Sequence, residues 1–326
     1  MIAARRRRPA TGRHACENAH IGPTGVRVED PSVNFSRLQP RMLGIAYRML
    51  GSLAEAEDVV QDVWTRWHDA DAGSVDNAEA WLVATTTRRA IDRLRQARTE
   101  REKYAGIWLP EPVLTESPAT PDELHEASSD LSIAFLIVLE RLAPEARAAF
   151  LLREVLDIDY DEIAGILGKT EAACRQIVHR AKSHLRDERA RFAVSDETHQ
   201  SLMRRFFAAL SSGDFAGMKR MFAESAVLVG DGGGIVTSFP KPMVGGQRIA
   251  QILYAATLGA RRDAAVALRV ELASINGRAG VLRYMHGQLE SAQSYDTDGE
   301  RIVRVYVQRN PEKLRRIAAN RAYALR

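Results

Sequence analysis

The spacing of apolar residues predicts three helices in the first part of the chain. From Phe35 onward, apolar residues recur near a spacing of 3.6, which predicts a helix that ends at Gly51. The motif "SLAE", Ser52 to Glu55, has capping-box spacing and begins a second helix. A third helix runs through "AWLVATTTRRAIDRLRQARTEREK", and this first domain ends near Tyr104. The positions expected to be buried are Leu38, Leu43, Ala46, Tyr47, Leu50, Val59, Val60, Val63, Trp64, Trp67, Trp81, Ala84, Ile91 and Leu94.

Residues 106–123 interrupt this helical pattern. Four prolines among scattered polar residues exclude a helix and predict an extended linker.

Helical spacing returns at Leu131 and continues to about Arg191. We expect helices over "LSIAFLIVLERL" and "PEARAAFLLREVL", then a short helix capped by Asp159 and Glu162. After Gly168 comes a last helix capped by Thr170. Its apolar stripe contains Cys174, Ile177, Val178, Ala181 and Leu185, and its other faces carry Arg175, Gln176, His179, Lys182 and Ser183.

The last two helices of this part form a helix-turn-helix pattern. Such a unit places its second helix in the DNA major groove, where Arg and Gln pair with guanine and adenine. The alternative is an ordinary helical hairpin with a solvated basic face. The distribution of charge favours DNA, because residues 169–191 hold seven Lys or Arg against three acids, whereas residues 137–162 hold three against seven.

The third helix of the first domain is also basic. Arg88, Arg89 and Arg93 follow three threonines, and Trp81 lies just before them. Basic and aromatic groups together suit a strand whose bases are unstacked and held. A solvated charged helix over a core anchored by tryptophan is the alternative.

Past Ser195 the pattern changes. One amphipathic helix, "HQSLMRRFFAALSSGD", precedes segments that alternate with period two: "AAVALRVELAS", "AGVLRYMHGQL" and "RIVRVYVQ". Between them lie a glycine-rich loop, "VGDGGGIVTSFPKP", and a short helix after Gly246. This part predicts an α+β domain with helices against a curved antiparallel sheet.

Composition adds bounds to this picture. A chain of 326 residues suits two or three domains, and its pI near 9.2 favours an anionic partner. Cys16 and Cys174 form neither a disulfide framework nor a zinc site. No apolar run is long enough for a membrane span and the start lacks a signal-peptide core, so we expect a cytoplasmic protein without membrane contact. Residues 1–33 are expected to be a disordered basic tail, or the product of a mis-assigned translation start.

Together these pieces resemble a bacterial sigma factor of the extracytoplasmic-function class. "AEDVVQDVWTRW", "AWLVATTTRRAIDRLR" and "DIDYDEIAGILGKTEAACRQIVHRAKSHL" look like its region 2 and region 4 motifs in the right order, over about residues 35–190. The resemblance implies a multidomain fold with two all-α domains. Its expected parts are region 2 over residues 34–105, a linker over 106–129 and the region 4 helix-turn-helix over 130–191.

The resemblance also implies roles for particular residues, with core RNA polymerase (its clamp helices and flap) and promoter DNA as partners. Asp58, Gln61 and Asp62 would face the clamp helices. Thr85, Arg88, Arg89, Asp92 and Arg93 would lie along the −10 element, and Lys169, Thr170, Arg175, Gln176 and His179 would read the −35 element. Such a protein carries out no covalent chemistry, and we expect no cofactor, no metal and no catalytic residue.

Residues 196–318 resemble a SnoaL-like (NTF2-like) cone, and this combination marks a sigma group whose extra domain replaces a separate anti-sigma protein. Three signatures of that group carry the likeness, and we expect regulatory contacts from them. They are "WLPEP" (Trp108, Leu109, Pro110, Glu111, Pro112), "DGGG" (Asp231, Gly232, Gly233, Gly234) and "NPEKL" (Asn310, Pro311, Glu312, Lys313, Leu314). The group usually has a lysine after the glycines, where this chain has Ile235. We hypothesise that the "DGGG" loop touches the "WLPEP" linker and sets the separation of the two DNA-binding domains; the alternative is a flexible hairpin.

Two other functions compete with this reading. An enzyme or small-molecule sensor would use a pocket in the C-terminal domain, to which Tyr254, Tyr284, His286 and Tyr306 could contribute. A stand-alone helix-turn-helix regulator would bind duplex DNA as a dimer without polymerase.

Overall fold

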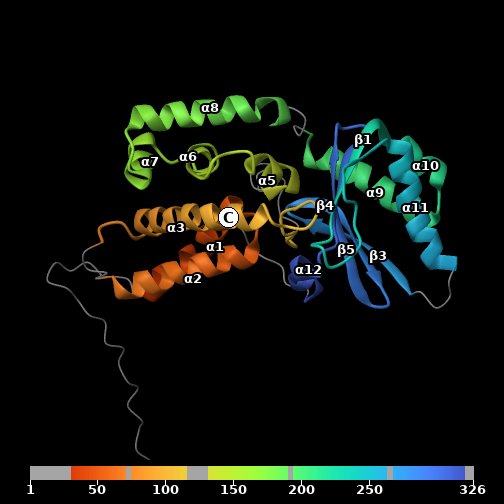
Figure 1. Cartoon of the computed structure of the whole chain (residues 1–326), viewed down its shortest axis with the longest axis horizontal. Coiled ribbons are helices and arrows are strands. Elements are labelled where there is room, and N and C mark those ends of the chain that lie inside the picture. The colour runs from red at the N-terminus through yellow and green to blue at the C-terminus, as the bar shows by residue number, and fades with distance from the viewer. Residues whose placement is uncertain (1–30, 71–74, 116–130, 190–193, 263–266, 320–326) are drawn as a thin grey trace, which may run out of the picture.

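The computed structural model describes residues 31–70, 75–115, 131–189, 194–262 and 267–319. Figure 1 shows helical layers on one side, a twisted sheet covered by helices on the other, and the linker between them. Residues 1–30 of the expected tail and the expected linker beyond Thr115 lie outside the described residues, whereas residues 31–33, expected in the tail, begin the first helix.

The first part folds into three helices, as the apolar spacing predicted. They are α1 (Pro31–Leu50), α2 (Leu53–Asp69) and α3 (Ala78–Arg101). Gly51 ends α1 with a positive φ of 64°, and the Ser52 side chain caps α2 by accepting from the backbone N–H of Glu55. Most of the predicted core positions are buried, but Leu43, Trp64, Trp81 and Ala84 are only half-buried. Trp64 lies at the edge of this core, where its ring meets Phe35 with centroids 4.6 Å apart.

The second part contains α5 (Ile133–Leu139), α6 (Pro144–Glu154), α7 (Tyr160–Leu167) and α8 (Glu171–Arg189). Gly168 makes the left-handed turn between α7 and α8, and Thr170 Oγ1 accepts from the N–H of Ala173 as expected of a cap. The expected capping of α7 is wrong in detail. Asp159 occupies the N-cap position but makes no side-chain cap bond, because its carboxylate pairs with Arg153 instead.

The two helical parts pack against each other through shared apolar clusters. One cluster joins Ala90, Ile91 and Leu94 of α3 to Leu136 and Phe150 of the second part. Another joins α1 and α3 to the helix-turn-helix core, with Ile45, Val83, Ala149, Leu152, Ile163, Ile166, Cys174 and Val178. In Figure 1, α3 accordingly lies between α1 and α2 on one side and α6 and α7 on the other. The two predicted DNA-binding parts therefore form one packed unit in this structure.

The C-terminal part is an α+β domain with a six-stranded sheet in the order β2-β1-β6-β5-β4-β3. Its elements are α9 (Asp196–Ser212), α10 (Phe215–Arg220), β1 (Phe222–Asp231), β2 (Met243–Val244), α11 (Gly246–Arg262), β3 (Leu268–Ile275), β4 (Arg278–Met285), β5 (Gln288–Thr297), β6 (Ile302–Gln308) and α12 (Pro311–Ala318). The expectation of an antiparallel sheet is wrong, because β1 and β6 pair in parallel and the sheet is mixed.

Three further details differ from the sequence expectations. The glycine-rich segment begins inside β1, and the segment "AGVLRYMHGQL" contains all of β4 except Arg278, then a turn and the start of β5. The helix after Gly246 has 17 residues and is not short.

The two faces of the sheet have different neighbours. The face that α9, α10 and α11 cover is filled by Phe206, Leu228, Ile249 and Val305, among others. The opposite face meets α12, the linker and α5, through Leu314 with Ile275 and through Tyr306 with Leu109 and Ile133. The C-terminal domain thus contacts the helical unit through the linker face of its sheet (Figure 1).

Candidate nucleic-acid interface

The polar face of α8 is open to solvent. Cys174 and Val178 are buried beneath the helix, whereas Arg175, Gln176 and His179 are exposed together on its other side. The Arg175 guanidinium lies 5.1 Å from the centroid of the Tyr160 ring, and its Nη2 is 2.6 Å from a Glu171 carboxylate oxygen. The expected −35 residues are therefore presented as a surface that DNA can reach, with Arg175 held extended by two neighbours.

The turn before α8 is more constrained. Lys169 Nζ lies 2.9 Å from the Glu145 carboxylate, and the other Glu145 oxygen is 2.9 Å from Arg95 of α3. The hydrogen bond from Lys169 lowers the pKa of Glu145 below its usual range. One carboxylate of α6 thus links a predicted −35 residue to the helix with the predicted −10 residues.

The predicted −10 residues of α3 are largely engaged in contacts within the protein. Arg88 donates from Nε to the carbonyl of Ile166 at 2.9 Å and from Nη2 to that of Gly165 at 2.8 Å. These carbonyls end α7, where the helix dipole favours a cation. Arg93 pairs with Glu55 at 2.7 Å, Asp92 lies between Arg89 and Arg95, and Thr85 is half-buried.

The predicted polymerase-facing residues lie on a free face of α2. Asp58, Gln61 and Asp62 are exposed, while the neighbouring Val59 and Val63 are buried. This acidic face of α2 is therefore exposed to solvent in the same structure in which Arg88 and Arg93 of α3 are bonded to other parts of the protein.

The three short signatures of the C-terminal part meet at one buried carboxylate, that of Asp231. Its Oδ1 accepts from the hydroxyl of Tyr104 at 2.7 Å, and its Oδ2 accepts from the N–H of Leu109 at 3.0 Å. Lys313 Nζ donates to the same Oδ2 at 2.7 Å and to the carbonyl of Leu109 at 2.6 Å. The "DGGG" loop, the "WLPEP" linker and the "NPEKL" helix are therefore in direct contact, which is the contact that the hypothesis required.

Lys313 is enclosed by aromatic rings as well as by the carboxylate. Its Nζ lies 4.4 Å from the centroid of the Trp108 ring and 4.7 Å from that of the Tyr104 ring. The Arg101 guanidinium also lies over the Trp108 ring, 3.9 Å from its centroid. Burial lowers the pKa of Lys313, and burial followed by the bond to Asp231 raises the pKa of Tyr104. Ile235, which stands where the sigma group usually has lysine, is 57% exposed, and Lys313 supplies the cation at Asp231.

The signatures also reach α2. Glu111 of the linker accepts at Oε2 from the backbone N–H of Leu53 at 2.8 Å, and therefore stabilises the start of α2. Its Oε1 pairs with Arg316 of α12 at 3.0 Å, and Arg316 also pairs with Glu57 on α2. Helix α2, which carries the predicted polymerase-facing residues, is thus tied to α12 of the C-terminal domain.

Gly233 and Asn310 show why this junction needs glycine. Gly233 has a φ of 66°, and a Cβ there would lie 2.4 Å from the Asn310 amide nitrogen. Asn310 caps α12 and donates to Tyr104 at 2.9 Å. Any side chain at Gly233 would therefore push α12 away from the linker.

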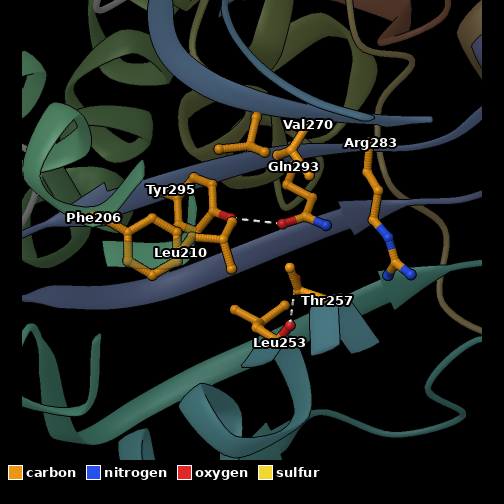
Figure 2. Close-up of a pocket in the computed structure, with 9 residues that line it drawn as sticks. Phe206, Leu210, Leu253, Thr257, Val270, Arg283, Gln293 and Tyr295 are labelled. Atoms are coloured by element: carbon orange, nitrogen blue, oxygen red, sulfur yellow. Dashed lines mark hydrogen bonds between the residues drawn. The ribbon is translucent and has the colours of Figure 1, made fainter. Parts of the chain in front are cut away.

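Residues proposed for an enzymatic pocket do not converge. Figure 2 shows a cavity between the sheet and helices α9 and α11, with a volume of about 10 Å³, which is room for one water molecule. Its lining residues are Phe206, Leu210, Leu253, Thr257, Val270, Val281, Arg283, Gln293 and Tyr295. None of Tyr254, Tyr284, His286 and Tyr306 is among them. Tyr254 packs on Phe215, His286 lies in an exposed turn and Tyr306 donates to Asp296 on the other face of the sheet.

Sequence reasoning missed several residues of this junction. Tyr47 was expected only as core, and Tyr104 only as a boundary, yet both use their hydroxyls to contact other parts of the chain. Asn276 was not singled out, although "NG" between two alternating segments predicts a tight turn.

In the part of the chain that the structure describes, no helix is long and apolar enough to cross a membrane.

Comparison with known proteins agrees with this geometry. The family Sigma-70 region 2 matches residues 35–100, and Sigma-70, region 4 matches residues 134–185. ECF RNA polymerase sigma factor SigJ of Mycobacterium tuberculosis is 33% identical over 248 residues, which cover 76% of this chain and 78% of SigJ. The chain is an extracytoplasmic-function (ECF) sigma factor. Sigma factors of this kind bind core RNA polymerase and promoter DNA and are not enzymes.

Two further comparisons show how far the likeness extends. The crystal structure of M. tuberculosis SigJ matches with a TM-score of 0.69 and 26% identity, over 87% of this chain and 98% of that chain. The probable ECF sigma factor SigI of the same organism is 33% identical over 175 residues, or 53% of this chain and 60% of SigI. The likeness to SigJ therefore includes the C-terminal α+β domain of this ECF sigma factor.

Proposed function

We propose that this ECF sigma factor starts transcription at its promoters and that its C-terminal domain controls that activity in cis. Asp58, Gln61 and Asp62 on α2 bind the clamp helices of core polymerase. The −35 element is read by Lys169, Thr170, Arg175, Gln176 and His179, and the −10 element by Thr85, Arg88, Arg89, Asp92 and Arg93.

The observation that carries the proposal of cis control is the pair of hydrogen bonds that Arg88 donates within the protein. Arg88, which we assign to the −10 element, donates from Nε and from Nη2 to two carbonyls at the end of α7. The arrangement with α3 packed against α7 is therefore a closed form that cannot open a promoter. The polymerase-facing residues of α2 remain exposed in that form, so polymerase can bind first and promote opening.

The C-terminal domain holds the closed form through Asp231. Its carboxylate is fully buried and joins the end of region 2, the linker and α12. Removing one partner of a buried ion pair costs about 3–5 kcal/mol, since the other charge stays buried without compensation. A domain attached in this way takes the place of a separate anti-sigma protein.

Run-off transcription with bacterial core polymerase tests the promoter function. Full-length protein should give promoter-specific transcripts, and Arg175→Ala should reduce them severalfold, while Gln96→Ala, an exposed change on α3, should leave them unchanged. The absence of transcripts on templates that include the gene's own upstream region would contradict the proposal.

The same assay tests cis control through the half-saturating concentration of core polymerase. Asp231→Asn keeps the size of the side chain but removes the charge that Lys313 requires. We expect a lower half-saturating concentration than for the wild type, because less energy is spent on opening. Identical curves for the two proteins would show that the junction has no role in control.

A further inference from the structure

The turn between β3 and β4 makes an unusual set of contacts. Asn276 and Gly277 connect the paired ends Ile275 and Arg278, with φ values of 53° and 78°. These values are typical of the two-residue hairpin turn that favours Asn-Gly. Such a turn requires nothing from the asparagine side chain beyond tolerance of a positive φ, and it is usually solvated. Here Asn276 is only 1% exposed.

Every polar atom of the Asn276 side chain pairs with a residue outside the C-terminal domain. Its Oδ1 accepts from the N–H of Val113 in the linker at 3.0 Å. Its Nδ2 donates to the hydroxyl of Tyr47 in α1 at 2.6 Å and to the carbonyl of Leu131, just before α5, at 3.0 Å. One side chain therefore contacts region 2, the linker and the start of the region 4 part.

The backbone of the turn strengthens this contact. The N–H of Asn276 donates to the carbonyl of Val113 at 2.8 Å, and the N–H of Gly277 donates to Thr115 Oγ1 at 2.9 Å. Leu114 forms a β-bridge with Ile275, so the linker extends the edge of the sheet at β3. The turn is consequently held against the linker on both of its sides.

Tyr47 passes the contact on within the helical unit. It is fully buried, and its hydroxyl donates to the carbonyl of Glu111 at 2.7 Å while accepting from Asn276. Glu111 in turn caps α2. The chain of hydrogen bonds thus runs from the C-terminal domain through α1 to the linker residue that fixes the start of the polymerase-facing helix.

We propose that Asn276 is a positioning residue that fixes region 2, the linker and the region 4 part in the closed arrangement, independently of Asp231. This inference rests on the cis control proposed above. The loss of the Nδ2 donor would remove this bond from the buried Leu131 carbonyl and would leave the Tyr47 hydroxyl with its bond to Glu111 but without its donor. The three parts would then separate more often.

The primary test is Asn276→Asp in the full-length protein. Aspartate also tolerates a positive φ, so the turn is retained, but it presents a second acceptor to the Leu131 carbonyl. Tyr47→Phe removes the same contact from the region 2 side. The matched control is His286→Asp in the turn between β4 and β5, because His286 has a φ of 52° and is exposed.

Amide hydrogen exchange should be followed in peptides that cover Tyr47, Val113 and Leu131. We expect Asn276→Asp and Tyr47→Phe each to raise exchange about tenfold in all three peptides, and the double variant to add little to either change. His286→Asp should leave all three peptides unchanged. Faster exchange in the Val113 peptide alone, or additive effects of the two variants, would reduce Asn276 to a local turn residue and overturn the inference.

A transcription measurement separates positioning from local stability. The half-saturating concentration of core polymerase should fall about threefold for Asn276→Asp and stay at the wild-type value for His286→Asp. If Asp231→Asn lowers this concentration and Asn276→Asp does not, the inference about Asn276 fails and cis control stands. If neither variant changes it, both fail.

Discussion

Helices α3 and α8 are both rich in arginine, and their arginines make different contacts. On α8, Arg175 stays exposed beside Gln176 and His179 and contacts Glu171 and the Tyr160 ring. On α3, Arg88 donates to the end of α7, and Arg93 pairs with Glu55. The arginines of α8 are thus open on one side, whereas Arg88, although exposed, is bonded to the end of α7.

The difference comes from the neighbours of each helix rather than from its composition. One side of α8 packs on α6 and α7, and its other side faces solvent. By contrast, α3 lies between two layers, with α1 and α2 on one side and α6 and α7 on the other. Thr86 and Thr87 of α3 are consequently buried. If α3 binds the −10 element as proposed, we expect one of these layers to move away first.

The largest expected effect is on the packing of other parts of the protein against α3. Asp231→Asn leaves the buried Lys313 without its charge partner, which should weaken docking of the C-terminal domain by about 3–5 kcal/mol. We expect faster hydrogen exchange in α3 and in the linker, with exchange on the exposed face of α8 unchanged. Equal changes in α3 and α8 would mean general unfolding and would remove the contrast between them.

The next effect compares the two helices directly in the free protein. Arg88→Ala removes two charge-assisted hydrogen bonds and should lower the free energy of unfolding by about 1.5–3 kcal/mol. Arg175→Ala removes only exposed contacts and should change it by no more than about 0.5 kcal/mol. Urea titration measures both, and similar values for the two variants would contradict the closed arrangement.

In the promoter complex the ranking of the same arginines should change. If Arg175 pairs with a guanine of the −35 element, Arg175→Ala should weaken promoter binding by the holoenzyme by about 1–3 kcal/mol. The effect should depend on the base at that position, unlike the loss of a phosphate contact. A loss that is uniform across promoter variants would assign Arg175 to the DNA backbone.

The smallest effect concerns Glu145, which links α3 to the start of α8. Its pKa is lowered in the folded protein, so its stabilising contribution is present above the unfolded pKa near 4.5 and is lost as the pH falls through the lower folded value. Because both partners are partly exposed to solvent, the contribution is below about 1 kcal/mol. Glu145→Gln should flatten the pH dependence of unfolding as the pH falls below the unfolded pKa, and an unchanged slope would exclude the link.

Local signals in the sequence were sufficient to predict the helices and the buried face of α8. The capping motif at Ser52, Gly168 and the apolar stripe of α8 each depend on neighbours in the chain, and each prediction is confirmed. The parallel pairing of β1 with β6 was missed because those strands are joined by most of the domain. Period-two alternation identifies strands but carries no information about their partners.

The junction could be predicted only in part for the same reason. The signatures indicated which segments would meet, but the partners of Asp231 are spread from Tyr104 to Lys313. The role of Asn276 was hidden because "NG" already has a sufficient local explanation. The burial of that side chain against Tyr47, 229 positions away, appears only in the fold.

The most direct test of the closed form is a distance measurement between the two helical parts. Spin labels can be attached to cysteines introduced at Thr65 on α2 and His184 on α8, since both positions are exposed and lie outside the residues assigned to polymerase or DNA. Of the two native cysteines, Cys16 can be replaced and Cys174 is buried, so neither competes for the label. Pulsed electron resonance should give one narrow distance in the free protein. In the complex with core polymerase and promoter DNA that distance should lengthen, with Arg88 released from α7. The same distance in both states would contradict the claim that opening of the sigma factor exposes its −10 surface.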